Sequence, residues 1–261
     1  MYHEKGIPFE NVYNFRDIGG HTTQDGRRIK QGILFRSDEM SRLSKKDLKK
    51  LNELKLRTII DLRTPNERRS KPDRLPPHNT IRLISVPIYP KKEDPNRWKK
   101  KLWFVTGRFK DFDFEKFTRT FYRKIAFEHT AQIGEIITLL SSPENLPALL
   151  HCSGGKDRTG FITACIQLLA GVPRETVIES YLYTNVLFKP HLKRYILFFR
   201  WMTLFQLTTE QIRPVFEARK EYLDTILDTV FEKYGSIDRY LREACNVTEE
   251  TLSRLHRLIL E

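Results

Sequence analysis

The stretch that decides the fold is LLHCSGGKDRTGF, which runs from Leu149 to Phe161. It joins an apolar run of strand length to a turn with two glycines, and a helical pattern follows. Cys152 ends the strand, and Arg158 stands six positions later. This order places the backbone N–H groups of the turn and the positive end of the helix around one point. The stretch therefore predicts a cradle for an anion with a thiol at its floor.

Cys152 has the surroundings of a nucleophile. A helix N-terminus and a nearby arginine stabilise a thiolate, so we expect Cys152 to be ionised at neutral pH and to attack an electrophile. The planar fork of Arg158 can hold two oxygens of a phosphoryl group. Thr159 can donate its hydroxyl to the thiolate when the thiolate leaves. The alternative for this pattern is a buried structural cysteine in an ordinary strand-to-helix turn.

The remaining residues of the turn are expected to bind phosphate. Ser153, Gly154 and Gly155 supply backbone N–H groups, and the two glycines allow a tight, closely approaching backbone. Lys156 adds a second cation, which either suits a more highly charged substrate or attracts any phosphate without selecting one. No pattern in the sequence resembles a metal site, and this chemistry needs neither a metal nor another cofactor.

The segment HCSGGKDRTG, residues 151–160, matches the signature of protein tyrosine phosphatases. Further matching segments are NFRDIGG (14–20), ILFRSD (33–38), IIDLR (59–63) followed by Glu67, and YGS (234–236) followed by Tyr240-Leu241. With these segments the chain resembles the bacterial tyrosine/serine phosphatase-like family, the atypical dual- or triple-specificity enzymes that include mycobacterial tyrosine phosphatase B. The resemblance spans most of the chain.

The resemblance implies a cysteine-dependent phosphatase that acts on phosphotyrosine, on phosphoserine or phosphothreonine, and on phosphoinositides. Lys156 resembles a lysine in the loop of the phosphatase-and-tensin-homologue lipid phosphatases, and Asp157 matches an aspartate in the myotubularin-type loop. Two alternatives stay open. One is a phosphatase that prefers phosphoinositides, and the other is a catalytically weak pseudophosphatase that binds phosphorylated ligands. The intact Cys152, Asp157 and Arg158 count against the second.

The leaving oxygen needs a proton, so the reaction calls for a general acid. Ordinary tyrosine phosphatases supply it from a Trp-Pro-Asp loop, a tripeptide that this sequence lacks. Our first candidate is Asp157, on the signature loop itself, although it could instead orient Arg158 or cap the helix. The second candidate is Asp61, at the end of an apolar strand where open α/β sheets place their sites.

Two other parts of the motifs have predicted places near the site. His151 is expected to orient the backbone of the loop rather than to act as a base. Arg16 and Asp17 either line the site or form a structural ion pair beside the turn at Gly19 and Gly20.

Hydrophobic periodicity predicts the secondary structure. The expected strands are residues 33–35, 56–62, 81–86 and 147–150. The expected helices are residues 44–54, 114–140, 159–170, 174–183, 192–205, 209–231, 237–244 and 249–260. In the helix of residues 114–140, Phe114, Phe117, Phe121 and Ile125 are expected to lie in the core.

This order of elements predicts one α/β domain over residues 1–261. The expected architecture is a protein tyrosine phosphatase-like fold, in which a central mixed sheet is flanked by helices and the C-terminal part, about residues 159–261, is helical. Strands that alternate with helices in the first half favour this arrangement.

Two segments combine basic and aromatic residues. The first, about residues 91–110, contains Trp98 and Trp103 and is either a solvated loop or an inserted lid over the pocket. The second runs from Phe198 to Trp201. Each could cover the pocket or contact an anionic membrane surface, because Lys stems and aromatic rings suit such an interface.

The charge of the chain favours phosphorylated partners. Its 261 residues include 46 Lys and Arg against 33 Asp and Glu, a net charge of +13. The expected partner is a phosphorylated protein or a phosphoinositide. Specific nucleic-acid binding is not expected, because the basic residues are spread along the chain and match no nucleic-acid motif. The sequence does not indicate an oligomeric state.

Composition also bears on the compartment. Hydrophobic residues make up 39% of the chain, which is enough for a core and excludes wholesale disorder. The three cysteines, Cys152, Cys165 and Cys245, are too few for a disulfide framework and fit a reducing compartment. The N-terminus lacks the pattern of a signal peptide. We therefore expect a cytoplasmic protein, with secretion by a route without a cleaved signal as an open alternative.

Overall fold

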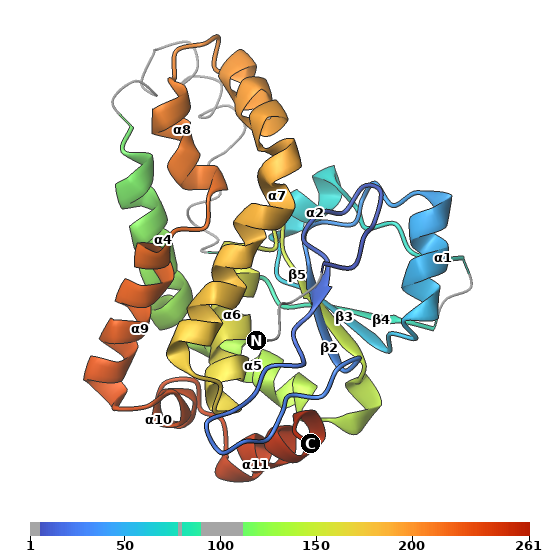
Figure 1. The fold of residues 1–261 in the computed structure, drawn as a ribbon, viewed down its shortest axis with the longest axis vertical. Coiled ribbons are helices and arrows are strands. Elements are labelled where there is room, and N and C mark those ends of the chain that lie inside the picture. The colour runs from blue at the N-terminus through green and yellow to red at the C-terminus, as the bar shows by residue number, and fades with distance from the viewer. Residues whose placement is uncertain (1–5, 78–79, 90–111) are drawn as a thin grey trace.

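A mixed five-stranded sheet is found in the part of the chain that the structure, a computed structural model, describes: residues 6–77, 80–89 and 112–261 (Figure 1). The strands are β1 (Arg16–Asp17), β2 (Leu34–Ser37), β3 (Thr58–Asp61), β4 (Arg82–Ser85) and β5 (Ala148–His151). Their order is β1-β2-β5-β3-β4, and only the pairing of β1 with β2 is antiparallel. The predicted mixed α/β sheet is confirmed. The segment of about residues 91–110, with Trp98 and Trp103, lies outside the described residues.

The register of the sheet gathers the strand ends at one edge. His151, the last residue of β5, pairs with Ser37 of β2 on one side and with Asp61 of β3 on the other. Both pairings are parallel, so all three strands end at the same level. Ligand sites of open α/β sheets lie at this carboxyl edge, and Cys152 follows there directly.

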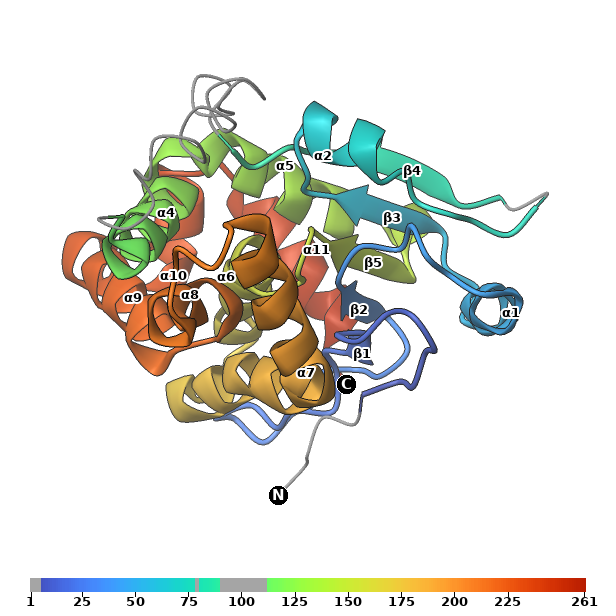
Figure 2. The same cartoon turned by 90° about the horizontal axis from the view of Figure 1, so that it is seen from above.

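The helices were expected to flank the sheet, and they do. They are α1 (Lys45–Glu53), α2 (Pro65–Ser70), α4 (Phe114–Glu128), α5 (Thr130–Leu140), the 3-10 turn η1 (Pro143–Asn145), α6 (Asp157–Leu169), α7 (Arg174–Met202), α8 (Thr209–Phe216), α9 (Lys220–Tyr234), α10 (Ile237–Glu243) and α11 (Glu249–Ile259). Figure 2 shows α1 on one side of the sheet and α5, α6 and α11 on the other.

Alternation along the strands explains the two layers. Phe35, Ile59 and Leu149 belong to the apolar cluster around α1, whereas their strand neighbours belong to the larger cluster of the helical side, for example Ile60 and Leu150. Successive side chains of a strand point to opposite faces. Because both faces are apolar, the sheet is covered on both sides.

Three predicted helices have different limits in the structure. The predicted helix 114–140 is two helices that meet at His129, because α4 packs against α8 and α9 whereas α5 packs against α11. The predicted helices 174–183 and 192–205 are one helix, α7, which continues through the exposed Pro190. A proline ring removes only one helical hydrogen bond, and the helix continues on both sides of it.

The predicted helix 209–231 is also two helices. Between α8 and α9 the chain becomes extended at Glu217 and again at Arg219, with ψ angles of 140° and 135°. The carbonyl oxygens at the end of α8 bind a side chain of the signature loop, as described below, which is a tertiary contact that periodicity does not reveal.

The predicted phenylalanine stripe of α4 is wrong at one position. Phe114 is buried, but 42% of the surface of Phe117 is exposed. The buried face of α4 is Phe114, Thr118, Tyr122 and Ile125, with the spacing of a helix that packs along one side. Phe117 instead lines a second cavity next to the site.

Side chains cap the starts of several helices. Ser44 and Asp47 form a capping box at the start of α1, and the hydroxyl of Thr248 caps α11 by accepting from the N–H of Thr251. Cys165 and Cys245 are buried and free. Among the described helices, none has both the length and the apolar character needed to cross a bilayer.

Candidate active site

The predicted anion cradle lies between β5 and α6. Cys152 follows the last residue of β5 and is 2% exposed. The helix begins at Asp157, two residues earlier than predicted. The unpaired N–H groups of its first turn, and the positive end of its dipole, therefore lie within the loop that carries Arg158.

The two glycines of the loop differ in what they do. Gly155 has a φ of +61°, and a Cβ at this position would lie 2.3 Å from the carbonyl oxygen of Ser37. No side chain fits there. Gly154 has room for a Cβ, since its nearest neighbour would be the Cβ of Lys156 at 4.0 Å. The predicted requirement for glycine therefore holds at Gly155, and the structure shows no such requirement at Gly154.

The N-terminal motif and β2 hold the loop from outside. The side-chain amide of Asn14 donates to the carbonyl oxygens of Gly154 and Gly155, at 3.0 and 2.9 Å. Arg36 of β2 also donates to Gly155, at 2.6 Å. Asn14 and Arg36 are both buried. These hydrogen bonds tie the signature loop to segments more than a hundred residues earlier in the chain.

Arg16 and Asp17 brace this N-terminal segment. The guanidinium of Arg16 is fully buried and donates to the carbonyl oxygen of Ser180 and the hydroxyl of Thr184, both on α7. The carboxylate of Asp17 accepts from the backbone N–H of Gly19 at 2.7 Å. Neither residue lines the cleft at Cys152. Asp17 braces the turn at Gly19 as the structural alternative expected, whereas these hydrogen bonds of Arg16 join it to α7.

Arg158 is held by Glu67, a residue of α2. Its two terminal nitrogens donate to the two carboxylate oxygens of Glu67, each at 2.8 Å. The hydroxyl of Ser153 and the backbone N–H of Thr64 also donate to this carboxylate. Burial raises the pKa of Glu67, but the hydrogen bonds and the charge of Arg158 outweigh it and lower this pKa to about 2. Glu67 is thus a carboxylate that fixes the guanidinium fork.

Sequence reasoning missed this role of Glu67, although a signal was present. Thr64 and Glu67 have the spacing of a capping box, and the structure shows that box at the start of α2. Such a box fixes where the carboxylate of its third residue lies. The segment was noted only for its resemblance to the family.

Cys152, Asp157 and Arg158 line one cleft of about 270 Å³. Ser153, Gly154 and Lys156 line it too, whereas Gly155 and Thr159 are not among its lining residues. Its walls come from the end of β2, the middle of α7, the end of α8 and the rim: Asp38, Glu39, Arg42, Lys71, Phe188, Leu192, Tyr195, Val215 and Phe216. From the segment Phe198–Trp201, for which cover of the pocket was one of two options, Phe199 lines the neighbouring cavity together with Asp157 and Arg158.

Lys156 has partners of its own in this structure. Its ammonium donates to the carbonyl oxygens of Val215 and Glu217, at 2.8 and 3.0 Å, and lies 3.3 Å from the carboxylate of Asp157. It is 5% exposed. The predicted phosphate-binding cation therefore also fastens the end of α8 to the signature loop.

Asp157 sits between the cleft and a buried pair of tyrosines. The hydroxyls of Tyr122 and Tyr181 lie 2.7 Å apart. Burial, and then the charge of Asp157, raise the pKa of Tyr122 well above its usual value, so both hydroxyls stay protonated. The hydroxyl of Thr159 is buried and makes no hydrogen bond within the described part of the chain.

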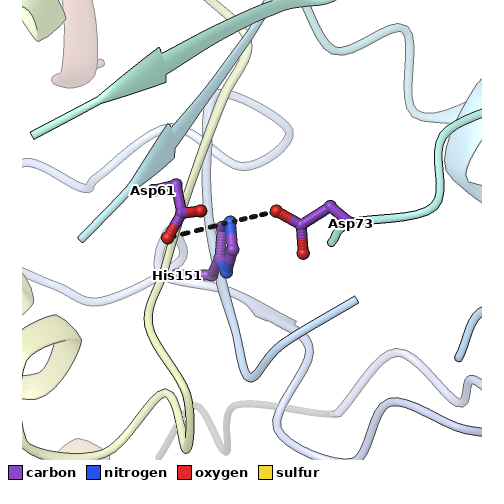
Figure 3. Close-up of side chains that lie close together, drawn as sticks. All are labelled: Asp61, Asp73 and His151. Carbon is purple, nitrogen blue, oxygen red and sulfur yellow. Dashed lines mark ion pairs between the residues drawn. The ribbon is translucent and has the colours of Figure 1, made fainter. Parts of the chain in front are cut away.

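Asp61 lies in a different environment, behind the loop. Figure 3 shows it beside His151 and Asp73, with Nε2 of His151 3.3 Å from Asp73 and 3.8 Å from Asp61. The guanidinium of Arg63 binds Asp61 at 2.8 Å and Asp73 at 2.5 Å. Burial raises the pKa of Asp73, but His151 and Arg63 outweigh it and lower this pKa below its usual value.

This cluster has the spacing of metal ligands, but a cation of the chain already lies between its two carboxylates. The guanidinium of Arg63 bridges both carboxylates, which makes the group a buried ion-pair network. Nδ1 of His151 lies 3.4 Å from the carbonyl oxygen of Cys152, close to the loop backbone as predicted. The network stiffens the strand ends beneath Cys152, and Asp61 does not line the cleft.

A family model described as the tyrosine phosphatase family matches residues 7–261. The chain belongs to the tyrosine phosphatase family. It is similar to triple specificity protein phosphatase PtpB of Mycobacterium tuberculosis, with 27% identity over 95% of this chain and 97% of the relative. A Cupriavidus necator protein assigned as a tyrosine-protein phosphatase is 28% identical, over 92% of this chain and 84% of that one. The predicted family and enzyme class are confirmed.

Similarity to solved structures is weaker. TpbA of P. aeruginosa, in complex with phosphotyrosine, matches with 14% identity over 68% of this chain and 76% of that one, at a TM-score of 0.38. A TM-score this low does not establish a common fold, and the phosphatase assignment rests on the family match.

Asp38 is a carboxyl group of this phosphatase that the sequence reasoning missed. It follows β2, lines the cleft and is 4% exposed. It accepts from the backbone N–H groups of Tyr13 and Asn14, at 3.0 and 2.9 Å. Burial outweighs these hydrogen bonds and raises its pKa to about 7. The sequence signal for Asp38 is its position at the end of a strand, which is also the reason for considering Asp61.

The raised pKa of Asp38 predicts a pH-dependent stability. The folded state holds this proton more tightly than the unfolded chain, so the stabilising contribution is complete below about pH 4 and is lost as the pH rises through about 7. We therefore expect the free energy of unfolding of the wild type, minus that of Asp38→Asn, to fall between about pH 4 and pH 7. Urea denaturation measures it. Asp238→Asn, a partly exposed carboxylate of α10 that pairs with Arg242, is the control, and a pH-independent difference for Asp38→Asn would contradict the assignment.

The Glu67 contact predicts a kinetic effect. Glu67→Gln keeps the shape of the side chain but removes the charge that fixes Arg158, and a slightly misplaced catalytic group costs about a hundredfold in rate. We expect kcat/KM for an aryl phosphate to fall by about that factor, with an unchanged thermal midpoint as evidence of folding. Glu53→Gln, at the end of α1, is the matched control. Full activity of folded Glu67→Gln would show that Arg158 needs no such partner.

Proposed function

We propose that this phosphatase hydrolyses phosphomonoesters through a cysteinyl-phosphate intermediate on Cys152. The observation that carries the proposal is the cleft at the start of α6, where the thiol of Cys152, the carboxyl group of Asp157 and the guanidinium of Arg158 meet. A nucleophile, an acid and a phosphate-binding cation are the three groups that phosphoryl transfer to a thiolate requires.

In the first step the sulfur of Cys152 attacks phosphorus and the bond to the leaving oxygen breaks. Arg158 and the N–H groups of residues 153–158 stabilise the equatorial oxygens of the transition state. Glu67 contributes by holding the guanidinium in place before the substrate arrives. Asp157 gives its proton to the leaving oxygen, so that an alcohol or phenol departs.

In the second step water attacks phosphorus and the sulfur–phosphorus bond breaks. Asp157, now a carboxylate, takes a proton from that water. The hydroxyl of Thr159 donates to the departing thiolate, which lowers the cost of its negative charge. Inorganic phosphate leaves, and Cys152 and Asp157 return to their starting states.

Asp157 is assigned as the acid because of where the two candidates lie. Asp157 lines the cleft with Cys152, whereas both oxygens of Asp61 are bound by Arg63 behind the loop. A general acid has to come within hydrogen-bond reach of the leaving oxygen. Asp61 would have to break a buried ion pair to do so, which costs several kcal/mol.

The proposed substrates are phosphotyrosine, phosphoserine or phosphothreonine, and phosphoinositides presented at an anionic membrane surface. The walls of the cleft support the aryl ester, because Phe188, Tyr195 and Phe216 can pack against a phenyl ring. Arg42 and Lys71 on the rim share the carboxylate of Glu39 and together leave one net positive charge for a second phosphate. The name of the mycobacterial relative, a triple specificity phosphatase, supports the breadth. A cytoplasmic location, where the thiol stays reduced, is part of the proposal.

Phosphate release from three substrates tests the proposal: a phosphotyrosine peptide, a phosphoserine peptide and a short-chain phosphoinositide. We expect turnover by the wild type that falls to background in Cys152→Ser, because serine is not ionised at neutral pH. Cys165→Ala, at the buried cysteine of α6, controls for loss of a cysteine. Turnover of the phosphoinositide alone would favour the lipid phosphatase alternative. Binding without turnover of any substrate would establish a pseudophosphatase and overturn the proposal.

The role of Asp157 is tested by the leaving group. We expect Asp157→Asn to slow phosphoserine hydrolysis by about 10²–10⁴-fold and p-nitrophenyl phosphate hydrolysis much less, because nitrophenolate leaves without a proton. Steady-state kcat for the two esters gives the comparison. Asp61→Asn should lower the thermal midpoint and slow both esters equally. A selective loss on phosphoserine in Asp61→Asn, and not in Asp157→Asn, would exchange the two roles.

A further inference from the structure

The C-terminal end of α7 carries a cluster of exposed apolar side chains that the reaction does not use. We call this cluster the α7 tip. Its members, which are 39–74% exposed, are Leu197, Phe198, Trp201, Met202, Leu204 and Phe205. In Figure 1 the end of α7 lies at the top of the molecule. Large apolar side chains grouped in this way mark a surface that binds another molecule.

The backbone holds the tip outward. Leu204 and Phe205 both have positive φ angles, 51° and 56°, a region that side chains other than glycine occupy at a cost. The N–H of Phe205 donates to the carbonyl oxygen of Arg200 at 2.7 Å, and Nε of Arg200 donates to that of Leu207 at 3.2 Å. The guanidinium of Arg200 also lies over the ring of Phe205, 5.5 Å from its centroid. The turn is thus built with its apolar side chains in solvent.

Positive charge lies directly behind the tip. Lys193 and Arg194 are exposed, about one helical turn before Leu197, and Lys189 is exposed one turn earlier. Arg194, Leu197 and Trp201 share one face of α7, by the spacing of the helix. No Asp or Glu occurs between Glu179 and Glu210. The end of α7 therefore combines exposed apolar side chains with positive charges that lie one to two helical turns before them.

We propose that the α7 tip docks on an anionic membrane surface. Trp201 and its neighbours enter the boundary between headgroups and acyl chains, while Lys193 and Arg194 meet the lipid phosphates one turn higher. Aromatic and leucine side chains next to Lys and Arg are the composition of interfacial membrane anchors. A second copy of the chain is a poorer occupant, because the same basic residues would face each other and each chain carries a net charge of +13.

Docking would place the cleft at the membrane. The opposite face of α7 lines the cleft through Phe188, Leu192 and Tyr195, so one helix joins the tip to the site. This consequence, access to phosphoinositides in a bilayer, rests on the proposed function. The docking itself does not, because it needs no turnover.

Vesicle co-sedimentation of the full chain tests the docking, with phosphatidylcholine vesicles that contain or lack phosphatidylserine. We expect binding only when phosphatidylserine is present. Trp201→Ala/Phe205→Ala and Lys193→Glu/Arg194→Glu should each lower the partition coefficient by at least about tenfold. Matched controls are Leu83→Ala, an exposed leucine of β4, and Lys45→Glu/Lys49→Glu on α1. The controls should bind like the wild type, and all four variants should release phosphate normally from a soluble phosphotyrosine peptide.

Three outcomes would overturn the proposal. Trp201→Ala/Phe205→Ala could bind as well as the wild type, or the charge reversal on α1 could weaken binding as much as the one on α7, which would mean attraction by net charge alone. A wild-type dimer on a sizing column that Trp201→Ala/Phe205→Ala dissociates, without vesicle binding, would assign the tip to a second copy. Cys152→Ser should bind vesicles like the wild type, which separates failure of docking from failure of the proposed reaction.

Discussion

The bidentate pair of Arg158 and Glu67 is the contact on which the site depends. A guanidinium can be aimed at an anion before that anion arrives only if something else holds it. Here two hydrogen bonds of 2.8 Å from α2 do so, and the same carboxylate also receives the hydroxyl of Ser153. Glu67 is itself fixed by the capping box of its helix. The start of α2 thus fixes the carboxylate of Glu67, and this carboxylate fixes the guanidinium of Arg158.

The rest of the fold holds the loop that carries this arginine. Asn14 and Arg36 donate hydrogen bonds to its carbonyl oxygens, and Asp38 accepts from the backbone N–H of Asn14. The ion pairs of Arg63 with its carboxylates hold the strand ends next to Cys152. Buried polar groups are costly unless they are fully paired. Their concentration around one loop indicates that the fold holds this loop in a precise position.

The sequence could predict the loop because its parts are contiguous. A strand, a tight turn and a helix start are local features, and their spacing brings Cys152 and Arg158 to one point. It could not predict the contact of Glu67 with Arg158, which joins residues 91 positions apart, or that of Asn14 with Gly154, which joins residues 140 apart. The predicted limits of α4 and α8 were wrong for a related reason, because these helices end where their packing against other elements changes.

The most direct test of the account is to stop turnover with acid and to find the phosphoryl group. During hydrolysis of a phosphotyrosine peptide, the quenched protein should carry the mass of one phosphoryl group on the peptide that contains Cys152. The adduct should form and decay as fast as phosphate is released, and it should be absent from Cys152→Ser. Phosphate release at full rate without an adduct, or with the adduct on another residue, would contradict the account.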